Sequence, residues 1–154
     1  MMEAVDILSA EDELFARLVT QIGGVPSERI ADVWPRVKPI LERVVTPDTG
    51  YSMDDVMLEL HDATAQLWII EDFQAVVVTK ILDRPTHRAF WVWFAAGDDV
   101  ASWIDDFTEL AEVFAKHMGC RYVEFSGRKG WAKFCKPNGY RVVLTTFRKD
   151  LNNG

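Results

Sequence analysis

The chain has 154 residues, of which 49% are apolar and 27% are charged. This length and composition suit one domain with a real core, and they exclude a disordered chain. No apolar run reaches the ~18 residues needed to cross a bilayer, and the net charge of −7 argues against binding nucleic acid over the whole surface.

The charge is unevenly distributed along the chain. Residues 121–149 hold eight Lys and Arg residues and one acid, a net charge of +7, so the remainder must carry −14 to give the total of −7. This basic third permits a local anionic ligand, but it is equally compatible with solvated edge residues. The N-terminus lacks the basic start and apolar core of a signal peptide, and the two cysteines have no metal-ligand spacing. We therefore expect one cytoplasmic domain over residues 1–154 with reduced thiols and no metal.

The N-terminal third indicates helices. Residues 2–8 suggest a short strand, and the apolar spacing after Ser9 predicts a helix that includes Ile22 and ends at Gly23-Gly24. Ser27 is the expected N-cap of the next helix.

Two further helix signals follow. Pro35 and Pro39 lie inside the second apolar stripe and predict a kink or two short helices, because each removes an N–H donor. Ser52 with Asp55 three residues later predicts the capped start of a third helix.

From residue 66 onward the apolar pattern alternates between strand and helix periods. The expected elements are a hairpin of strands at 66–70 and 75–81, an apolar central strand at 89–95, a helix at 100–118 ended by Gly119, a strand at 122–125, a short helix at 131–136 and a last strand at 140–148. This order predicts an α/β domain of three layers, α-β-α, with a mixed and mostly antiparallel central sheet.

The order of these elements resembles that of the GNAT superfamily, the GCN5-related N-acetyltransferases, over most of the chain. The segment from Gly127 to Tyr140 is similar to the family's last helix and its Gly-aromatic ending. More narrowly, Val33-Trp34-Pro35, Gln66-Leu67-Trp68 and Gly127-Arg128-Lys129-Gly130-Trp131 resemble a GNAT-like group found in phages and prophages.

The resemblance implies an N-acyltransferase that uses acetyl-CoA or another acyl-CoA and acts on an amine. In the family, the central strand lends backbone groups to the pantetheine arm, which here implies Phe94, Ala95 and Ala96. The loop and helix N-terminus that follow hold the pyrophosphate. The corresponding residues are Gly97, Asp98, Asp99, Val100, Ala101 and Ser102.

Five residues in the basic third are further candidates. Arg128 and Lys129 in their glycine-bounded loop could grip a phosphate or carboxylate, and Trp131 could stack on an adenine or a partner, unless the cations are solvated and Trp131 packs in the core. Glu124 is the candidate general base through water, or else an outward-facing strand residue. Cys135 lies four residues before Gly139, where many members keep the tyrosine that protonates the leaving thiolate. The alternative for Cys135 is a small buried apolar residue.

Two functions therefore remain open. Asp98 and Asp99 occupy the loop where the family has glycines, and they repel a pyrophosphate unless one of them simply caps the helix. The first function is an acetyl-CoA-dependent N-acyltransferase with an amine substrate that the sequence does not identify. The second is a non-catalytic GNAT-like structural or interaction protein of phage or prophage type with a degenerate CoA loop. A homodimer through the last strand is compatible with either function, and no nucleic-acid or membrane partner is expected.

Overall fold

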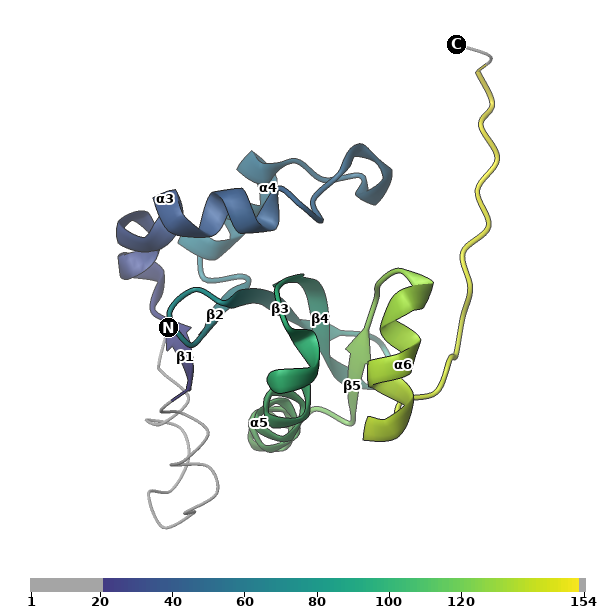
Figure 1. Ribbon diagram of the computed structural model, residues 1–154. Coiled ribbons are helices and arrows are strands. Elements are labelled where there is room, and N and C mark those ends of the chain that lie inside the picture. The colour runs from purple at the N-terminus through teal and green to yellow at the C-terminus, as the bar shows by residue number, and fades with distance from the viewer. Residues whose placement is uncertain (1–20, 153–154) are drawn as a thin grey trace.

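A five-stranded mixed sheet organises the computed structural model, which describes residues 21–152 (Figure 1). In spatial order its strands are β1 (Ile22–Val25), β2 (Gln66–Ile70), β3 (Ala75–Asp83), β4 (Arg88–Gly97) and β5 (Tyr122–Phe125). Neighbouring strands from β1 to β4 are antiparallel, whereas β5 runs parallel to β4.

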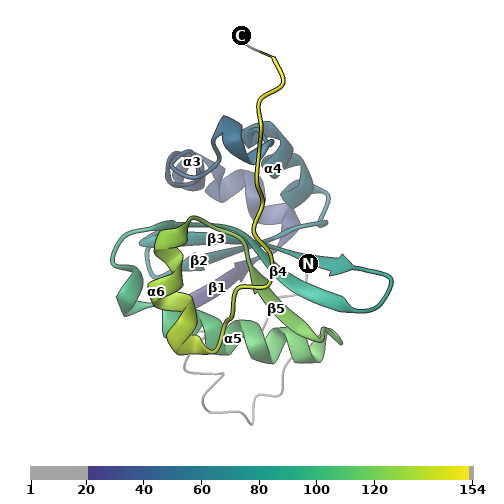
Figure 2. The same ribbon diagram turned by 90° about the vertical axis from the view of Figure 1, so that its right-hand side faces the viewer.

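Helices cover both faces of the sheet. The α-helices are α3 (Ile30–Leu41), α4 (Met53–His61), α5 (Ile104–His117) and α6 (Ala132–Cys135). Helices α3 and α4 lie on one face and α5 lies on the other, while α6 lies beside β5 (Figures 1 and 2). One buried cluster joins α5 to the sheet and a second joins α3 and α4 to the opposite face. The predicted three-layer α/β architecture is confirmed.

Short 3₁₀ helices extend or precede the longer elements. They are η1 (Ser27–Arg29), η2 (Pro47–Thr49), η3 (Val100–Ser102), η4 (Lys129–Trp131) and η5 (Lys136–Asn138). The helix predicted from residue 100 therefore begins as a 3₁₀ turn and becomes α-helical at Ile104. No helix within residues 21–152 is long and apolar enough to cross a membrane.

The hairpin and the central strand are confirmed. β2 and β3 pair antiparallel, and most of β4 is buried. The buried polar groups of this region form a short chain in which the Trp68 Nε1–H donates to Thr79 Oγ1 and the Thr79 hydroxyl donates to Gln66 Oε1, both at 2.9 Å. Each of these donors has an acceptor on the next side chain, so the polar side chains are buried without an unpaired atom.

The prediction that a helix ends at Gly23-Gly24 is wrong for the residues that the structure describes. Ile22 to Val25 form the edge strand β1, which pairs antiparallel with β2. Ile22 is buried and lies opposite Ile70, which ties this segment to the sheet. The glycines that resemble a helix stop are instead backbone partners of β2. The strand predicted at 2–8 and the beginning of the predicted helix lie outside the described residues.

The two prolines do not divide the second helix, because α3 is assigned as one helix from Ile30 to Leu41. Pro35 and Pro39 lie on its exposed side, where water can satisfy the carbonyl groups that lose their N–H partners. Ser27 does not cap this helix, since it lies in η1 and makes no capping hydrogen bond. Ser52 does cap α4, in a reciprocal capping box with Asp55.

The last predicted strand is also wrong. Residues 141–151 have no regular secondary structure and lie extended outside the body of the molecule (Figures 1 and 2). The segment begins at Gly139, which ends η5 in the left-handed conformation at φ 86°. A strand needs a neighbour for its backbone groups, and within residues 21–152 this segment pairs with none. The alternating apolar pattern is thus present without the pairing that it predicts.

Candidate active site

β4 and β5 separate halfway along β4. Their paired residues end at Val92 and Phe125, and the Ser126 amide makes a last, long hydrogen bond of 3.4 Å to the Val92 carbonyl. β4 continues to Gly97, paired from there on only with β3. Within residues 21–152, the edge of β4 from 93 to 97 therefore has no strand partner on the β5 side.

A β-bulge lies where the two strands separate. In the register between β3 and β4, Val78 pairs with Phe94 and Thr79 pairs with Val92, so Trp93 is the extra residue. A bulge bends its strand and increases the local twist. The bulge thus accounts for the turn of β4 away from the direction of β5.

The predicted arm-binding residues lie on this open edge. Phe94, Ala95 and Ala96 are buried, at 4–6% exposure, and follow the bulge directly. An unpaired strand edge offers amide and carbonyl groups to an extended ligand in the way that it would offer them to another strand. The two alanines also keep side-chain bulk away from that edge. These residues fit an amide-containing arm.

An aromatic wall lies at the same point on the α3 and α4 face. Trp91 and Trp93 stack with ring centres 5.9 Å apart, and Tyr51 meets Trp93 edge-on at 4.9 Å. The Trp91 indole N–H donates to Ser126 Oγ at 2.8 Å. Trp91 and Trp93 are two residues apart in a strand, and this spacing could have indicated that they share a face of the sheet. Nothing in the local sequence indicates that Tyr51 contacts them.

Glu124 lies next to Trp91 in the register of β5 and β4. Both of its carboxylate oxygens accept from Arg84, at 2.6 and 2.8 Å, and His87 Nε2 lies 4.0 Å away. The hydrogen bonds to Glu124 raise the pKa of the Arg84 guanidinium. Glu124 could act as a base only if Arg84 released it, because the bidentate pair occupies both of its carboxylate oxygens.

Cys135 is half-buried at the end of α6, and burial raises the pKa of its thiol. The thiol therefore stays protonated near neutral pH, as a proton donor must. Tyr140 was not predicted as a candidate. Its hydroxyl lies 3.5 Å from Thr108 Oγ1, and burial is the largest cause of its raised pKa.

The predicted pyrophosphate loop satisfies many of its own polar groups. The Gln74 side chain donates to Ser102 Oγ at 3.0 Å and the Ser102 hydroxyl donates to the Asp99 carbonyl at 2.7 Å. The Trp103 indole N–H donates to the Asp98 carbonyl at 3.1 Å. A Cβ on Gly97 would lie 2.3 Å from the Cβ of Ala75, so glycine is required here by packing against β3.

The loop and the start of α5 are acidic. Asp98 pairs with Arg43 at 3.2 Å, and Asp99 has the left-handed φ of 50°. Neither carboxylate caps a helix, so that interpretation is not confirmed. Asp105 and Asp106 occupy the first turn of α5, where they already compensate the positive end of the helix dipole. Because of these carboxylates, the loop does not fit a diphosphate.

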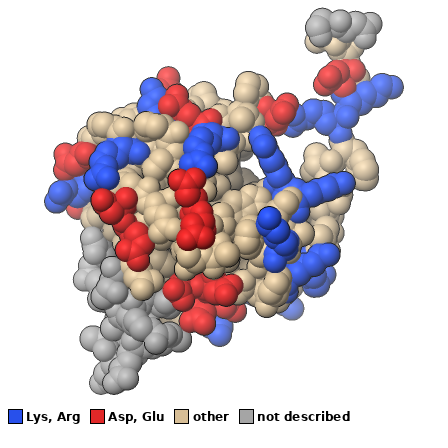
Figure 3. Space-filling model, in the orientation of Figure 1, with Lys and Arg blue, Asp and Glu red and all other residues tan. Residues whose placement is uncertain are grey.

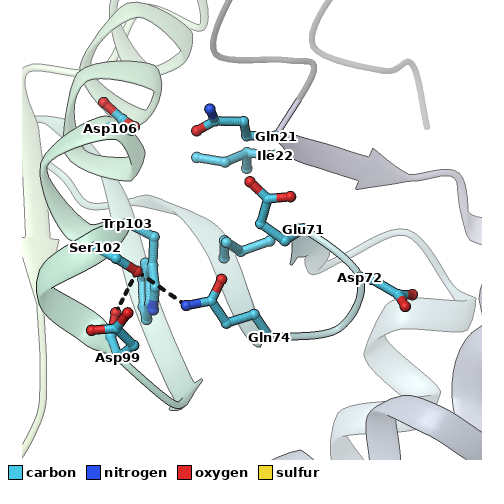
Figure 4. A pocket seen from close by; sticks show the side chains of 10 residues that line it. Gln21, Ile22, Glu71, Asp72, Gln74, Asp99, Ser102, Trp103 and Asp106 are labelled. Atoms are coloured by element: carbon cyan, nitrogen blue, oxygen red, sulfur yellow. Dashed lines mark hydrogen bonds between the residues drawn. The ribbon is translucent and has the colours of Figure 1, made fainter.

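A hollow of about 590 Å³ lies beside this loop (Figure 4). Its lining residues are Gln21, Ile22, Ile70, Glu71, Asp72, Gln74, Asp99, Ser102, Trp103 and Asp106. It lies between β1, the β2–β3 turn and the start of α5, not where β4 and β5 separate. Four of these side chains are carboxylates, which disfavour an anionic ligand. The open edge of β4 is therefore the better candidate for an acyl-CoA arm.

The basic loop after β5 has the opposite charge. Arg128 and Lys129 are exposed, and neither forms an ion pair with a residue in the range 21–152. Trp131 packs against Phe125 at 4.9 Å, and the close approach of this ring leaves no room for a Cβ on Gly127. Trp131 thus belongs partly to the core, while the two cations are free to meet an anion.

Comparisons with known proteins agree on the fold. No protein-family model matches the sequence, and no curated protein matches it. A GCN5-related N-acetyltransferase from Ralstonia eutropha has a similar structure, with a TM-score of 0.59 and 10% identity over 86% of this chain and 99% of its own.

Two similar structures have named substrates. Glucosamine-6-phosphate N-acetyltransferase from Arabidopsis thaliana has a TM-score of 0.59 and 13% identity, over 86% of this chain and 98% of its own. An aminoglycoside acetyltransferase from an uncultured soil sample, in complex with sisomicin, has a TM-score of 0.62 and 11% identity, over 86% of this chain and 96% of its own. The chain has the fold of the GNAT acetyltransferases.

Proposed function

We propose that this protein is an acyl-CoA-dependent N-acyltransferase, with acetyl-CoA as the donor and an amine as the acceptor. The observation that supports this most is the open edge of β4 from 93 to 97, created by the bulge at Trp93 and the end of pairing at Val92. Phe94, Ala95 and Ala96 would hold the pantetheine arm through their backbone groups.

Charge suggests a different diphosphate contact from the one that the resemblance implies. Loops at the carboxyl ends of adjacent parallel strands lie at the same edge of a sheet, so residues 97–102 after β4 and 126–130 after β5 share that edge. The first loop is acidic and the second carries Arg128 and Lys129. In our proposal these two cations make the main diphosphate contacts, and Trp131 borders the same loop.

When bound, acyl-CoA supplies an acyl group activated as a thioester. In the transfer, a bond forms between the acceptor nitrogen and the acyl carbon, the carbon–sulfur bond breaks, and the amine loses a proton while the thiolate gains one. Glu124, once released by Arg84, would take the first proton through water, and Cys135 would supply the second. Tyr51, the exposed member of the aromatic wall, would border the acceptor, whereas Trp93 is buried and already has Lys80 Nζ 4.8 Å from its ring centre.

A second function is favoured by the acidic loop itself. Asp98 is held by Arg43, Asp105 and Asp106 occupy the first turn of α5, and the loop satisfies its own polar groups. A non-catalytic GNAT-like structural or interaction protein, of the phage or prophage type that the sequence resembles, needs no diphosphate site there. Absence of CoA binding would favour this function.

Calorimetric titration with acetyl-CoA and CoA tests the proposal. We expect saturable micromolar binding that weakens at least tenfold in the double variant Arg128→Glu/Lys129→Glu. The matched control is Lys38→Glu, which reverses an exposed charge on α3, a helix distant in sequence from the loop at 126–130. Absence of heat and of thermal stabilisation at millimolar acetyl-CoA would overturn the proposal.

Thiol release then identifies the acceptor. The substrate panel would include glucosamine-6-phosphate and sisomicin, the amines named for the two similar structures, together with simple polyamines. We expect turnover of a cationic amine that falls in Glu124→Gln. Tight acetyl-CoA binding without turnover of any amine would contradict the catalytic part of the proposal while leaving the cofactor part in place.

A further inference from the structure

A histidine lies beside the ion pair between Arg84 and Glu124. His87 Nε2 is 3.3 Å from Arg84 Nη1 and 4.0 Å from Glu124 Oε2. Arg84 and His87 belong to the turn between β3 and β4, where the Arg84 amide donates to the His87 carbonyl, whereas Glu124 comes from β5. The side chains are 39%, 23% and 28% exposed, respectively. They therefore form one partly buried cluster of two opposite charges and an imidazole.

The contacts determine which nitrogen of the neutral imidazole carries the proton. A guanidinium has only N–H donors, so His87 Nε2 must accept from Arg84 Nη1 and carry no proton of its own. The proton then lies on Nδ1, which is 3.0 Å from Thr86 Oγ1 and donates to it. Tyr122 of β5 meets the ring edge-on at 4.9 Å between ring centres. Neutral His87 is thus an acceptor that faces Arg84.

Arg84 Nη1 lies between two acceptors. It is 2.6 Å from Glu124 Oε2 and 3.3 Å from His87 Nε2, while Arg84 Nη2 donates separately to Glu124 Oε1 at 2.8 Å. A small rotation of the guanidinium toward His87 would free Oε2 while Oε1 stays bound. A partly buried N–H that loses its acceptor costs free energy. The imidazole removes that cost because it takes over the hydrogen bond.

Protonation of His87 removes this second acceptor. The imidazolium carries a proton on Nε2, which faces the Nη1 donor of Arg84 and attracts Glu124 Oε2. An imidazole is the side chain that ordinarily gains its proton between pH 5 and 8. In the protonated state two cations therefore hold Glu124, and neither of its oxygens is free.

The other charged groups around the imidazole pair elsewhere. Asp83 and Arg88, at the ends of β3 and β4, pair with each other at 2.6 Å. Arg121 lies over the Tyr122 ring, 5.4 Å from its centre. Within residues 21–152, Glu124 is the one acid at ion-pair distance from His87. The competition for Arg84 thus involves one carboxylate and one imidazole.

We infer that His87 is a positioning residue for the proposed general base. Neutral His87 accepts from Arg84 and releases Glu124 Oε2, and protonated His87 withdraws that oxygen from use. This role rests on the proposed function, because only a transfer from an amine needs the base. The hydrogen bonds of the cluster do not depend on acyl-CoA. The imidazole accounts for how a carboxylate held by two hydrogen bonds can serve as a base.

Imidazole ¹⁵N spectra of the full chain test the cluster without any ligand. At about pH 8, where an imidazole is ordinarily neutral, the His87 ring should carry its proton on Nδ1. The variant Arg84→Met should move that proton to Nε2, where Glu124 accepts it. The chain has three histidines, so the signal missing from His87→Gln identifies the ring.

The matched control for Arg84→Met is Arg121→Met, which removes a neighbouring cation that lies over Tyr122. The proton should stay on Nδ1 of His87 in this variant. A wild-type ring with its proton on Nε2, or an unchanged ring in Arg84→Met, would overturn the inference.

The pH profile of thiol release tests the catalytic consequence with the amine that the substrate panel identifies. In wild type, kcat should fall as the pH drops through the range in which an imidazole gains its proton. His87→Gln keeps an acceptor for Arg84 that takes up no proton, so its kcat should fall only at lower pH. His87→Phe keeps the ring beside Tyr122 without the acceptor, so its kcat should be about tenfold lower at neutral pH.

Two controls separate this role from a structural one. The KM for acetyl-CoA should stay within about twofold in both His87 variants, since neither changes the proposed cofactor contacts. His61→Gln, at the exposed end of α4, should keep the wild-type profile. The same profile in His87→Gln and wild type would reject the role of His87. Absence of turnover with every amine would reject the proposed function and this role with it, whereas the spectra decide the cluster by themselves.

Discussion

At the scale of single residues, the fold and the candidate site depend on a few contacts between residues that are distant in the sequence. Thr79 joins the indole of Trp68 to the amide oxygen of Gln66, although these residues lie on two strands. Gly97 is fixed by its approach to Ala75. Glu124 and Arg84, 40 residues apart, hold each other. None of these pairings can be inferred from local sequence, because each joins segments that only the fold brings together.

Replacement of Thr79 by Val should destabilise the fold without changing side-chain volume. The substitution leaves the Trp68 N–H and the Gln66 Oε1 buried and unpaired, which costs about 1–3 kcal/mol in the free energy of unfolding. Urea denaturation measures this cost, and Thr79→Ser is the control that keeps the hydroxyl. Equal stability of Thr79→Val and wild type would contradict the assigned chain of hydrogen bonds.

Gly97→Ala should also destabilise the protein, by about 1–3 kcal/mol, since the added methyl group would overlap Ala75. Gly130→Ala is the matched control, because a Cβ there meets nothing within 4 Å. Thermal unfolding compares the two variants. If both proved equally stable, the tight packing between β4 and β3 would be wrong. A loss of ligand binding in Gly97→Ala would therefore not by itself identify a ligand site.

The raised pKa of Cys135 predicts a pH dependence of stability. Because burial raises the pKa of the folded thiol, the unfolded chain ionises first as the pH rises. The contribution is complete below the ordinary thiol pKa and is lost as the pH rises through the folded one. Denaturation from neutral to alkaline pH should show a smaller fall in stability for Cys135→Ala than for wild type, and identical slopes would refute the burial effect.

At the scale of elements, local periodicity predicted β2, β3, β4, α5 and β5, together with the capped start of α4. It failed where the decisive contact is distant. The glycines of β1 resemble a helix stop, yet pairing with β2 makes them a strand. The bulge at Trp93 depends on the register with β3, and nothing in the sequence marks it. Of the candidate site, the order of the elements alone indicated the stretch in which the open edge of β4 lies, whereas the aromatic wall and the partner of Glu124 could not be predicted.

The acidic start of α5 provides a prediction at this scale. Asp99→Asn/Asp106→Asn removes two carboxylates from the hollow beside the loop. Because the proposed diphosphate contacts are Arg128 and Lys129 in the other loop, the affinity for acetyl-CoA should stay within about twofold of wild type, since salt screens charges that are not in close contact. Titration at two salt concentrations measures it. Acetyl-CoA binding that is more than about tenfold tighter at low salt would place the diphosphate at this loop and contradict the proposed contacts.

At the scale of the whole molecule, the chain divides into an acidic body and a basic C-terminal side (Figure 3). The basic side holds the loop at Arg128 and borders the open edge of β4. The separation of β4 from β5 gives a ligand an unpaired strand edge beside these cations.

Hydrogen–deuterium exchange with and without acetyl-CoA tests the ligand site most directly. The bound arm should slow exchange of the amides between 93 and 97 and in the loop at 126–130. It should leave β1 and β2, on the far side of the sheet, unchanged. Slowed exchange confined to the hollow beside the start of α5, or no change anywhere at saturating ligand, would contradict binding at the open edge of β4.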